Sequence, residues 1–376
     1  MKSLNKSRES CSVDKVQIAG RDELSALEAQ RRAYEIAFGP IVFQVSRLMC
    51  KFGILKLLQE NRDGLDYGSI IEKTGLRKYA VQVLMEASLF IGSVKKVEDK
   101  FFLTKTGWFL LEDEQVRINM NFNHDVNYLG MYELERSLLT GKPEGLKTLG
   151  AWERIYEGLA SMNAVAQKSW FDFDHYYSDH AFSEALEILF SDPSCKLRRI
   201  LDIGGNTGRW AVQCVKYDPD VHVTILDIPE QIGLLKKHVI ENQCVSGRER
   251  IHAVEGDLLK HETTIPAGFD VIWMSQFLDC FSEKNIVSIL RKTSAVMTAD
   301  SKLYIMETLW DRQRFQTASF CLTLISLYFT AMANGESKMY HMADLVQCIE
   351  SAGLKVETIH DHLGEHHTLI CCRKKD

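Results

Sequence analysis

The chain has 376 residues, of which 45% are hydrophobic and 26% charged, so it is long enough for two domains with substantial cores. Its net charge of −6 argues against a protein that binds nucleic acid over its whole surface. Ten cysteines are scattered without paired or metal-ligand spacing, which favours free thiols in the cytoplasm and no metal site.

The N-terminal residues are polar and mixed in charge, without the apolar stretch of a signal peptide. We expect a disordered tail over 1–25. The longest apolar run, 320–333, is expected to be too short and too interrupted to cross a bilayer. The sequence therefore predicts a cytoplasmic protein with no membrane partner.

Apolar residues recur at three- and four-residue steps over 36–60, which predicts amphipathic helix with a break near Gly53. A short helix ending at a glycine, a second helix over 77–90 and two short strands over 93–104 follow. Helix, turn, helix and hairpin in this order are typical of a winged helix. We assign 26–110 to this domain.

A winged helix invites a DNA-binding hypothesis, which depends on the chemistry of its second helix. That helix carries Arg77 and Lys78 at its start and is mostly apolar afterwards. A helix of this composition packs within the chain or against a second copy. We therefore expect a dimerisation domain and no nucleic-acid partner.

A helical connector is predicted over 111–195, and aromatic residues concentrate in its second half. Aromatic side chains most often belong to a core, but their number ahead of a ligand-binding domain also fits the wall of a pocket for a flat apolar substrate. They are Trp152, Tyr156, Trp170, Phe171, Phe173, Tyr176 and Tyr177.

Strands and helices alternate through the last domain, 196–376. Repeated β-α units predict an α/β fold with a Rossmann-like, mostly parallel sheet that binds ligands at the C-terminal ends of its strands. Two strands close together near the C-terminus, over 355–359 and 368–372, suggest one antiparallel member.

A glycine turn lies between the first strand and the first helix of this domain. Asp202 ends the strand, and Gly204, Gly205 and Gly208 follow, so backbone can approach a ligand closely at a helix N-terminus. The spacing differs from the dinucleotide fingerprint, and the acid disfavours a phosphate at the mouth of the loop. It suits a ligand with an amino group and a positive charge, such as S-adenosylmethionine.

Acidic and polar residues follow each of the next strands. Asp227 lies where such folds place an acid on ribose hydroxyls, with Ile228 beside it. Each acid alone is equally well explained as a helix cap or a solvated side chain. Their succession at strand ends after a glycine turn favours a cofactor site. The other candidates are Gly256, Asp257, Leu258, Ser275, Gln276 and Asp279.

These motifs resemble those of class I S-adenosylmethionine-dependent methyltransferases. Residues 35–374 resemble the two-domain small-molecule O-methyltransferases typified by acetylserotonin and caffeic acid O-methyltransferases. The resemblance implies a homodimer built through the N-terminal domain and a small-molecule methyl acceptor. It also implies S-adenosylmethionine as cofactor, its methionine part on Asp202, Gly204, Gly205 and Gly208, its ribose on Asp227, and its adenine on Asp257 and Leu258.

The chain departs from this family at the expected general base. Asp279 stands where the family has a histidine that deprotonates the acceptor hydroxyl, and a carboxylate near its ordinary pKa is a poor base for a phenol unless burial raises that pKa. Glu307 matches the glutamate that orients the histidine, while the second such glutamate falls at Met342. His341 beside it is an alternative base, or an ordinary loop histidine.

Three hypotheses follow for the function. The first is methylation of a hydroxyl or similar nucleophile on an aromatic or otherwise apolar small molecule, by in-line displacement at the sulfonium methyl. The second is a diverged member with N- or C-methylation or a non-methylating reaction. The third is a non-catalytic, cofactor-binding regulator that acts through its winged helix.

Overall fold

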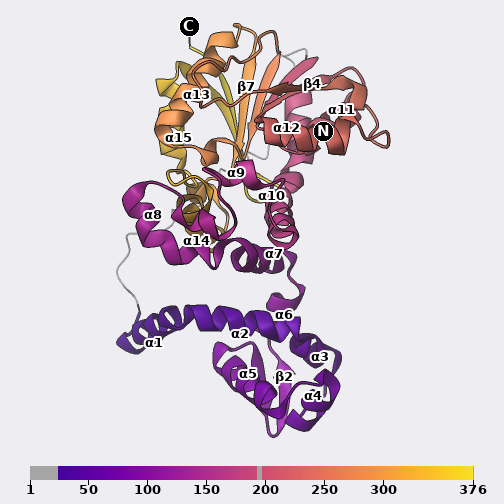
Figure 1. The fold of residues 1–376 in the computed structure, drawn as a ribbon, viewed down its shortest axis with the longest axis vertical. Coiled ribbons are helices and arrows are strands. Elements are labelled where there is room, and N and C mark those ends of the chain that lie inside the picture. The colour runs from indigo at the N-terminus through magenta and orange to yellow at the C-terminus, as the bar shows by residue number, and fades with distance from the viewer. Residues whose placement is uncertain (1–23, 193–196, 376) are drawn as a thin grey trace, which may run out of the picture. The chain divides into compact units, whose positions relative to one another are not determined.

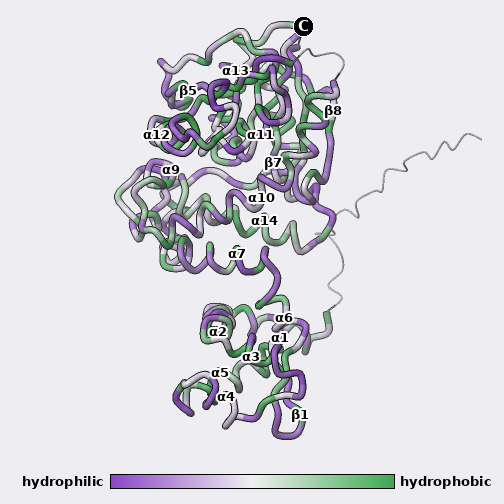
Figure 2. Tube along the Cα trace, turned by 90° about the vertical axis from the view of Figure 1, so that its right-hand side faces the viewer, coloured by the Kyte–Doolittle hydropathy of each residue, from purple (hydrophilic) through white to green (hydrophobic). Residues whose placement is uncertain are grey.

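The computed structural model describes residues 24–192 and 197–375, and almost all of the predicted N-terminal tail lies outside them. The chain forms two compact units that divide between Asn123 and His124 (Figure 1). Hydrophobic residues recur in both units, so each has its own core (Figure 2). The last helix before the division, within the predicted connector, groups with the smaller unit.

The smaller unit contains a helical array followed by a hairpin, in the order predicted from the sequence. Gly53, at φ 72°, breaks the amphipathic stretch at the predicted place, because this left-handed conformation suits glycine. The two strands of the hairpin pair antiparallel. Its elements are α1 (Ala26–Ala37), α2 (Gly39–Lys51), α3 (Ile54–Glu60), α4 (Tyr67–Thr74), α5 (Lys78–Ile91), β1 (Val94–Val97), β2 (Lys100–Leu103), α6 (Lys105–Glu112) and α7 (Glu114–Phe122).

Helix α5 buries one face in this unit and leaves apolar side chains on another. Val81, Leu84 and Met85 lie in the core, whereas Phe90 is 90% exposed. Helix α1 has no buried residue and exposes Leu27, Tyr34 and Ile36. The described residues of the smaller unit therefore leave apolar surface of that unit uncovered.

The larger unit begins with helical turns that lead into one long helix. Asn163 caps α10 by accepting a hydrogen bond from the Ala166 backbone N–H at 3.0 Å, so a 27-residue helix starts at a defined point. The elements are η1 (Asn123–Asn127), η2 (Gly130–Glu133), α8 (Leu134–Thr140), η3 (Glu144–Thr148), α9 (Ile155–Gly158) and α10 (Ala164–Phe190).

A seven-stranded sheet forms the centre of the larger unit, in the order β5-β4-β3-β6-β7-β9-β8. The predicted Rossmann-like fold is confirmed, including one antiparallel strand, β9, between β7 and β8. The strands are β3 (Arg199–Ile203), β4 (His222–Asp227), β5 (Ile251–Glu255), β6 (Val271–Ser275), β7 (Lys302–Glu307), β8 (Leu354–Leu363) and β9 (His367–Lys374).

Helices cover both faces of this sheet, α11 and α12 on one side and α13 and α15 on the other (Figure 1). Neighbouring strand residues such as Ile200 and Leu201 point to opposite faces and so join different core clusters. The helical elements here are α11 (Arg209–Tyr217), α12 (Pro229–Leu235), η4 (Lys236–Ile240), η5 (Arg248–Arg250), η6 (Leu278–Cys280), α13 (Glu283–Val296), η7 (Trp310–Arg312), α14 (Gln316–Tyr328), η8 (Phe329–Ala333) and α15 (Met342–Ser351).

The apolar run near residue 320 corrects an expectation from the sequence. Helical structure extends over Gln316–Ala333, which by length and composition could cross a membrane. The prediction that this stretch is too short and too interrupted was therefore wrong. Core helices of soluble proteins pass the same test. Tyr328, Phe329 and Met332 of this stretch are buried within the larger unit.

Two stacked tryptophans pack the helix that follows the glycine turn against the sheet. Trp210 of α11 and Trp273 of β6 have ring centroids 4.1 Å apart at an interplanar angle of 13°, and Trp273 is fully buried. Strand β6 pairs with β3, with Trp273 opposite Asp202. The stack therefore supports the place where the glycine turn leaves the sheet.

We predict that Trp273→Ala lowers the free energy of unfolding by about 3–5 kcal/mol, because it leaves a large cavity between sheet and helix. Urea unfolding followed by circular dichroism measures this change. Tyr132→Ala, at a side chain that is 92% exposed, is the control and should change stability little. Equal effects of the two substitutions would contradict the prediction.

Candidate functional site

The glycine turn after β3 has the backbone geometry that the sequence predicted. Gly204 and Gly208 have φ of 77° and 82°, a region that L side chains rarely adopt. A Cβ on Gly205 would lie 2.5 Å from Oδ2 of Asp202, and one on Gly204 would lie 2.2 Å from the Phe277 ring. The turn therefore needs glycine for its own close packing as well as for a ligand.

Asp202 lies under this turn and is only 2% exposed. Its Oδ2 has no hydrogen-bond partner among the described residues. Burial, followed by the charge of Asp227, raises the pKa of Asp202 well above its ordinary value. A buried carboxylate without a partner is costly, which indicates that a ligand supplies the missing contact.

Asp227 ends β4 and is held by backbone donors. The Asn206 N–H donates to its Oδ2 at 2.9 Å, and the Ile228 N–H donates to its Oδ1 at 2.7 Å. These bonds favour the charged form, yet burial dominates and raises the pKa of Asp227 to about 6. Asn206 thus connects the glycine turn to the second strand end.

Asp257 follows β5 and makes an ion pair that the sequence did not reveal. Arg154, just before α9, donates to its Oδ2 at 3.0 Å, and the Leu259 N–H donates to its Oδ1 at 3.0 Å. Gly256 bonds through its N–H to the Asp227 carbonyl at 2.9 Å, and Leu258 is buried. The third strand end therefore adjoins the second, as predicted.

The end of β6 carries Ser275 and Gln276, whose Oγ and Oε1 atoms are buried without hydrogen-bond partners among the described residues. Gln276 also has φ 45°, an uncommon conformation for a residue other than glycine. Strained backbone and unsatisfied polar atoms at one strand end are typical of a binding site.

Asp279 lies in η6, three residues further on, and is 5% exposed. Burial raises its pKa to about 6, while hydrogen bonds from Cys280 favour the charged form. Glu307, at the end of β7, accepts the backbone N–H groups of Phe277 and Leu278 at 3.1 and 2.8 Å. Glu307 thereby fixes the turn that presents Asp279.

Glu307 and Asp279 form a coupled pair of buried acids. Burial, and next the charge of Asp279, raises the pKa of Glu307 well above its ordinary value. Two carboxylates in one buried site do not both ionise readily. Burial and mutual repulsion therefore raise the pKa of Glu307 above its ordinary value, and burial raises that of Asp279.

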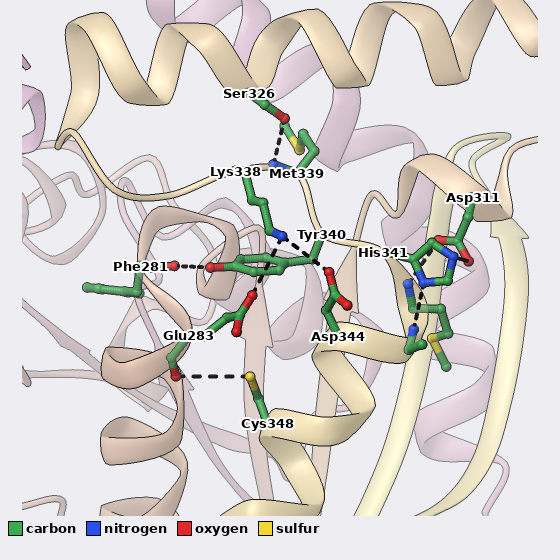
Figure 3. Close-up of polar contacts among 12 residues, drawn as sticks. Phe281, Glu283, Asp311, Ser326, Lys338, Met339, Tyr340, His341, Asp344 and Cys348 are labelled. Carbon is green, nitrogen blue, oxygen red and sulfur yellow. Dashed lines mark hydrogen bonds and ion pairs between the residues drawn. The ribbon is translucent and has the colours of Figure 1, made fainter. Parts of the chain in front are cut away.

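His341 lies apart from this pair. It caps α15 by accepting the Ala343 N–H on Nδ1 at 3.0 Å, and its Nε2 is 3.3 Å from Oδ2 of Asp311. Figure 3 shows His341 directed at Asp311, while the preceding Tyr340 points to the Phe281 carbonyl, to which its hydroxyl donates at 2.6 Å. The adjacent residues thus face different neighbours.

Sequence analysis did not place several side chains close to Asp279. Burial raises the pKa of Asp174 of α10 and of the hydroxyls of Tyr156 and Tyr328, and the charge of Asp279 adds to the shift of each. The Trp170 ring N–H donates to the Tyr328 hydroxyl at 2.7 Å. Their one signal was the aromatic concentration ahead of the glycine turn, which did not single out Asp174.

A parallel sheet with a glycine turn and a row of buried acids along its C-terminal edge is typical of a cofactor-binding α/β enzyme of the methyltransferase class. The O-methyltransferase domain family matches residues 168–355, and a dimerisation2-like domain family matches residues 30–101. The chain belongs to the O-methyltransferase family. It is a methyltransferase, and its cofactor is S-adenosylmethionine.

Known proteins resemble the chain over most of its length. It is 23% identical to acetylserotonin O-methyltransferase of Macaca mulatta, over 87% of this chain and 93% of that one. It is 22% identical to demethylspheroidene O-methyltransferase of Rhodobacter capsulatus, over 85% and 76%. The structure of mitomycin 7-O-methyltransferase matches at a TM-score of 0.68 with 19% identity, over 92% and 98%.

The solved structure of human N-acetylserotonin methyltransferase in complex with S-adenosylmethionine matches at a TM-score of 0.61 with 19% identity, over 95% of this chain and 100% of that one. At these identities the structures establish the fold. The residues of this site fit the cofactor, because atoms of Asp202, Ser275 and Gln276 that have no hydrogen-bond partner among the described residues offer acceptors to its ammonium and hydroxyl groups.

We predict that Asp202→Asn stabilises the ligand-free protein at neutral and alkaline pH. The folded pKa of Asp202 lies above its unfolded value, so the carboxyl costs stability at high pH, and this cost disappears as the pH falls below the unfolded pKa. We expect a melting temperature higher by roughly 2–6 °C at about pH 8 and little gain at about pH 4.

Thermal unfolding of both proteins at the two pH values measures this difference. The same substitution should weaken S-adenosylmethionine binding, because stability and ligand recognition conflict at this residue. A lower melting temperature at both pH values would show that the Asp202 carboxylate supports the fold.

Proposed function

We propose that the chain methylates a hydroxyl group of an aromatic or otherwise apolar small molecule, with Asp279 as general base and Glu307 as the residue that positions it. The observation that carries this proposal is the burial of Asp279 beside the glycine turn, which raises its pKa to about 6. A base is most effective when its pKa lies near the working pH.

We also propose that the predicted cofactor residues hold S-adenosylmethionine along the C-terminal edge of the sheet. The turn of Gly204, Gly205 and Gly208 would receive the methionine part above Asp202, and Asp227 would accept the ribose hydroxyls. The adenine would lie near Leu258, with Asp257 and Arg154 at its edge. The bound cofactor supplies an electrophilic methyl group on a positively charged sulfur.

Aromatic side chains support a flat acceptor. Tyr156, Tyr328 and Tyr340 lie where the charge of Asp279 acts on their hydroxyls. Burial raises the pKa of each, so they remain hydrogen-bond donors at neutral pH. The Tyr340 hydroxyl already donates to the Phe281 carbonyl. The rings and the hydroxyls of Tyr156 and Tyr328 are therefore the groups that would orient an aromatic acceptor.

A carboxylate base restricts which hydroxyls react well. With a pKa of about 6, Asp279 remains a weaker base than the anion of a simple phenol, whose pKa is about 10. A more acidic hydroxyl reduces this mismatch. We therefore propose an acceptor whose hydroxyl is activated by a neighbouring electron-withdrawing group, and 4-nitrocatechol is a better first probe than catechol.

We predict that Asp279→Asn lowers turnover by about 100-fold or more even at saturating S-adenosylmethionine, because the variant loses proton transfer. For the unaltered enzyme, kcat/KM for S-adenosylmethionine should fall as the pH drops through about 6, because protonation of Asp279 removes the base. Methyl transfer from labelled cofactor to the best of several phenols and catechols measures both effects.

His341→Ala is the matched comparison for this prediction. Both ring nitrogens of His341 make contacts at the start of α15. The substitution should therefore lower the free energy of unfolding and have a smaller effect on turnover. Turnover that survives in Asp279→Asn and disappears in His341→Ala would identify His341 as the base. Analysis of the product would show whether oxygen, nitrogen or carbon receives the methyl group.

We further propose that the chain forms a homodimer through its N-terminal unit. The dimerisation2-like match covers residues 30–101, which include α2 to α5 and most of α1. Phe90 on α5 and the apolar side chains of α1 are exposed in the single chain. A second copy would remove this apolar surface from water.

We predict that Phe90→Asp weakens this dimer by tenfold or more, because a charge replaces an apolar contact at the interface. Sedimentation velocity over a range of concentrations measures the shift towards monomer. Ile359→Asp, which changes an exposed apolar residue on β8 of the other unit, is the control and should remain dimeric. A monomeric unaltered protein would refute the dimer.

A further inference from the structure

The carboxylate of Asp174 has no role in the proposed function, although it is attached to the glycine turn. Its Oδ2 accepts a hydrogen bond from Nδ2 of Asn206 at 3.2 Å. The backbone N–H of the same Asn206 donates to Asp227. Asn206 has φ 49°, so an uncommon backbone conformation holds this bridge between α10 and the cofactor loop.

Asp174 also lies within reach of the charge of Asp279. Burial, followed by the charges of Asp279 on η6 and of Asp179 on α10, raises the pKa of Asp174 to about 7. The opposing influences come from the Asn206 hydrogen bond and from Arg209 of α11. The Arg209 guanidinium is already paired with Asp179, with its Nε 3.0 Å from Oδ1.

An independent feature indicates that a positive ligand belongs here. Asp202, under the same turn, is 2% exposed, and its Oδ2 has no hydrogen-bond partner among the described residues. Buried carboxyl groups around one turn keep their protons unless a cation lies close enough to favour the charged form. The guanidinium of Arg209 supplies part of that charge but is paired with Asp179, so a positively charged ligand would be the further cation.

We propose that Asp174, together with Asp279, recognises the sulfonium charge of S-adenosylmethionine, so that the site distinguishes the methyl donor from S-adenosylhomocysteine, its product. This inference rests on the cofactor placement in the proposed function. It adds a specificity-determining residue from α10, outside the strand-end motifs.

The chemistry makes this discrimination useful for turnover. The acceptor oxygen forms a bond to the methyl carbon, the carbon–sulfur bond breaks, and its electron pair remains on sulfur. The hydroxyl proton passes to Asp279. Sulfur is then neutral, so the attraction that held the donor is lost and the product is released more easily.

The test is calorimetric titration of the full chain with S-adenosylmethionine and, separately, with S-adenosylhomocysteine. Asp174→Asn should weaken binding of the first about tenfold or more and binding of the second by less than about threefold. Asp174→Glu keeps the charge and should recover part of the loss. Asp172→Asn, which alters an acid paired with Lys168 on the same helix, should change neither affinity.

A second measurement, of the protons released on ligand binding, uses the unaltered protein and so does not depend on whether a variant folds. A cation beside Asp174 favours its carboxylate form, so S-adenosylmethionine should release protons on binding at about pH 6–7, whereas S-adenosylhomocysteine should release far fewer. Titration in two buffers of different ionisation enthalpy counts these protons. The groups that face Asp174 are Asp279, Asp179, Arg209 and Asn206.

Equal losses for both ligands in Asp174→Asn, or equal proton release on binding both, would overturn the inference, because the sulfonium charge is the difference between them. Unchanged affinities in Asp174→Asn would overturn it as well. If the unaltered protein bound neither ligand, the cofactor placement would fail, and this outcome is distinct from loss of discrimination.

Discussion

Carboxylates held out of water along one edge of a parallel sheet are the constraint on which this site depends. Burial raises the pKa of Asp202, Asp227 and Asp279 above ordinary values, so each costs folding free energy at neutral pH. Backbone N–H groups reduce that cost at Asp227. Asp202 has no such bond to Oδ2 among the described residues, which agrees with the proposal that a ligand supplies the missing contact.

The fold keeps these groups in place through contacts that are themselves apolar or neutral. The Trp210–Trp273 stack fixes α11 against the sheet directly beside Asp202. Glu307 acts through its acceptor oxygen, since it accepts hydrogen bonds from the backbone of the turn before Asp279. Backbone contacts therefore hold the turn that presents Asp279.

Sequence analysis succeeded where function follows from local chain geometry. The alternation of strands and helices predicts a parallel sheet, and the C-terminal ends of its strands necessarily lie along one edge, so Asp202, Asp227 and Asp279 could be placed together. Asp174 and Arg154 could not be found in this way, because packing of distant helices brings them to the edge. The direction in which a side chain points could not be predicted either. His341 and Tyr340 are neighbours in sequence, but their side chains contact different residues.

An aspartate base changes the charge balance of methyl transfer. A histidine base is neutral before the reaction and positive after it, whereas Asp279 in the proposed role of base would begin negative beside a positive sulfur and end neutral beside a neutral one. In that mechanism, attraction between Asp279 and the sulfonium would stabilise the bound donor more than the transition state, where both charges have decreased, and such ground-state binding does not accelerate a reaction. An acidic acceptor hydroxyl would compensate, because its proton leaves readily even to a weak base. The proposed aspartate base therefore agrees with the proposal of an activated hydroxyl in the acceptor, and loss of its attraction to sulfur after transfer agrees with release of the product.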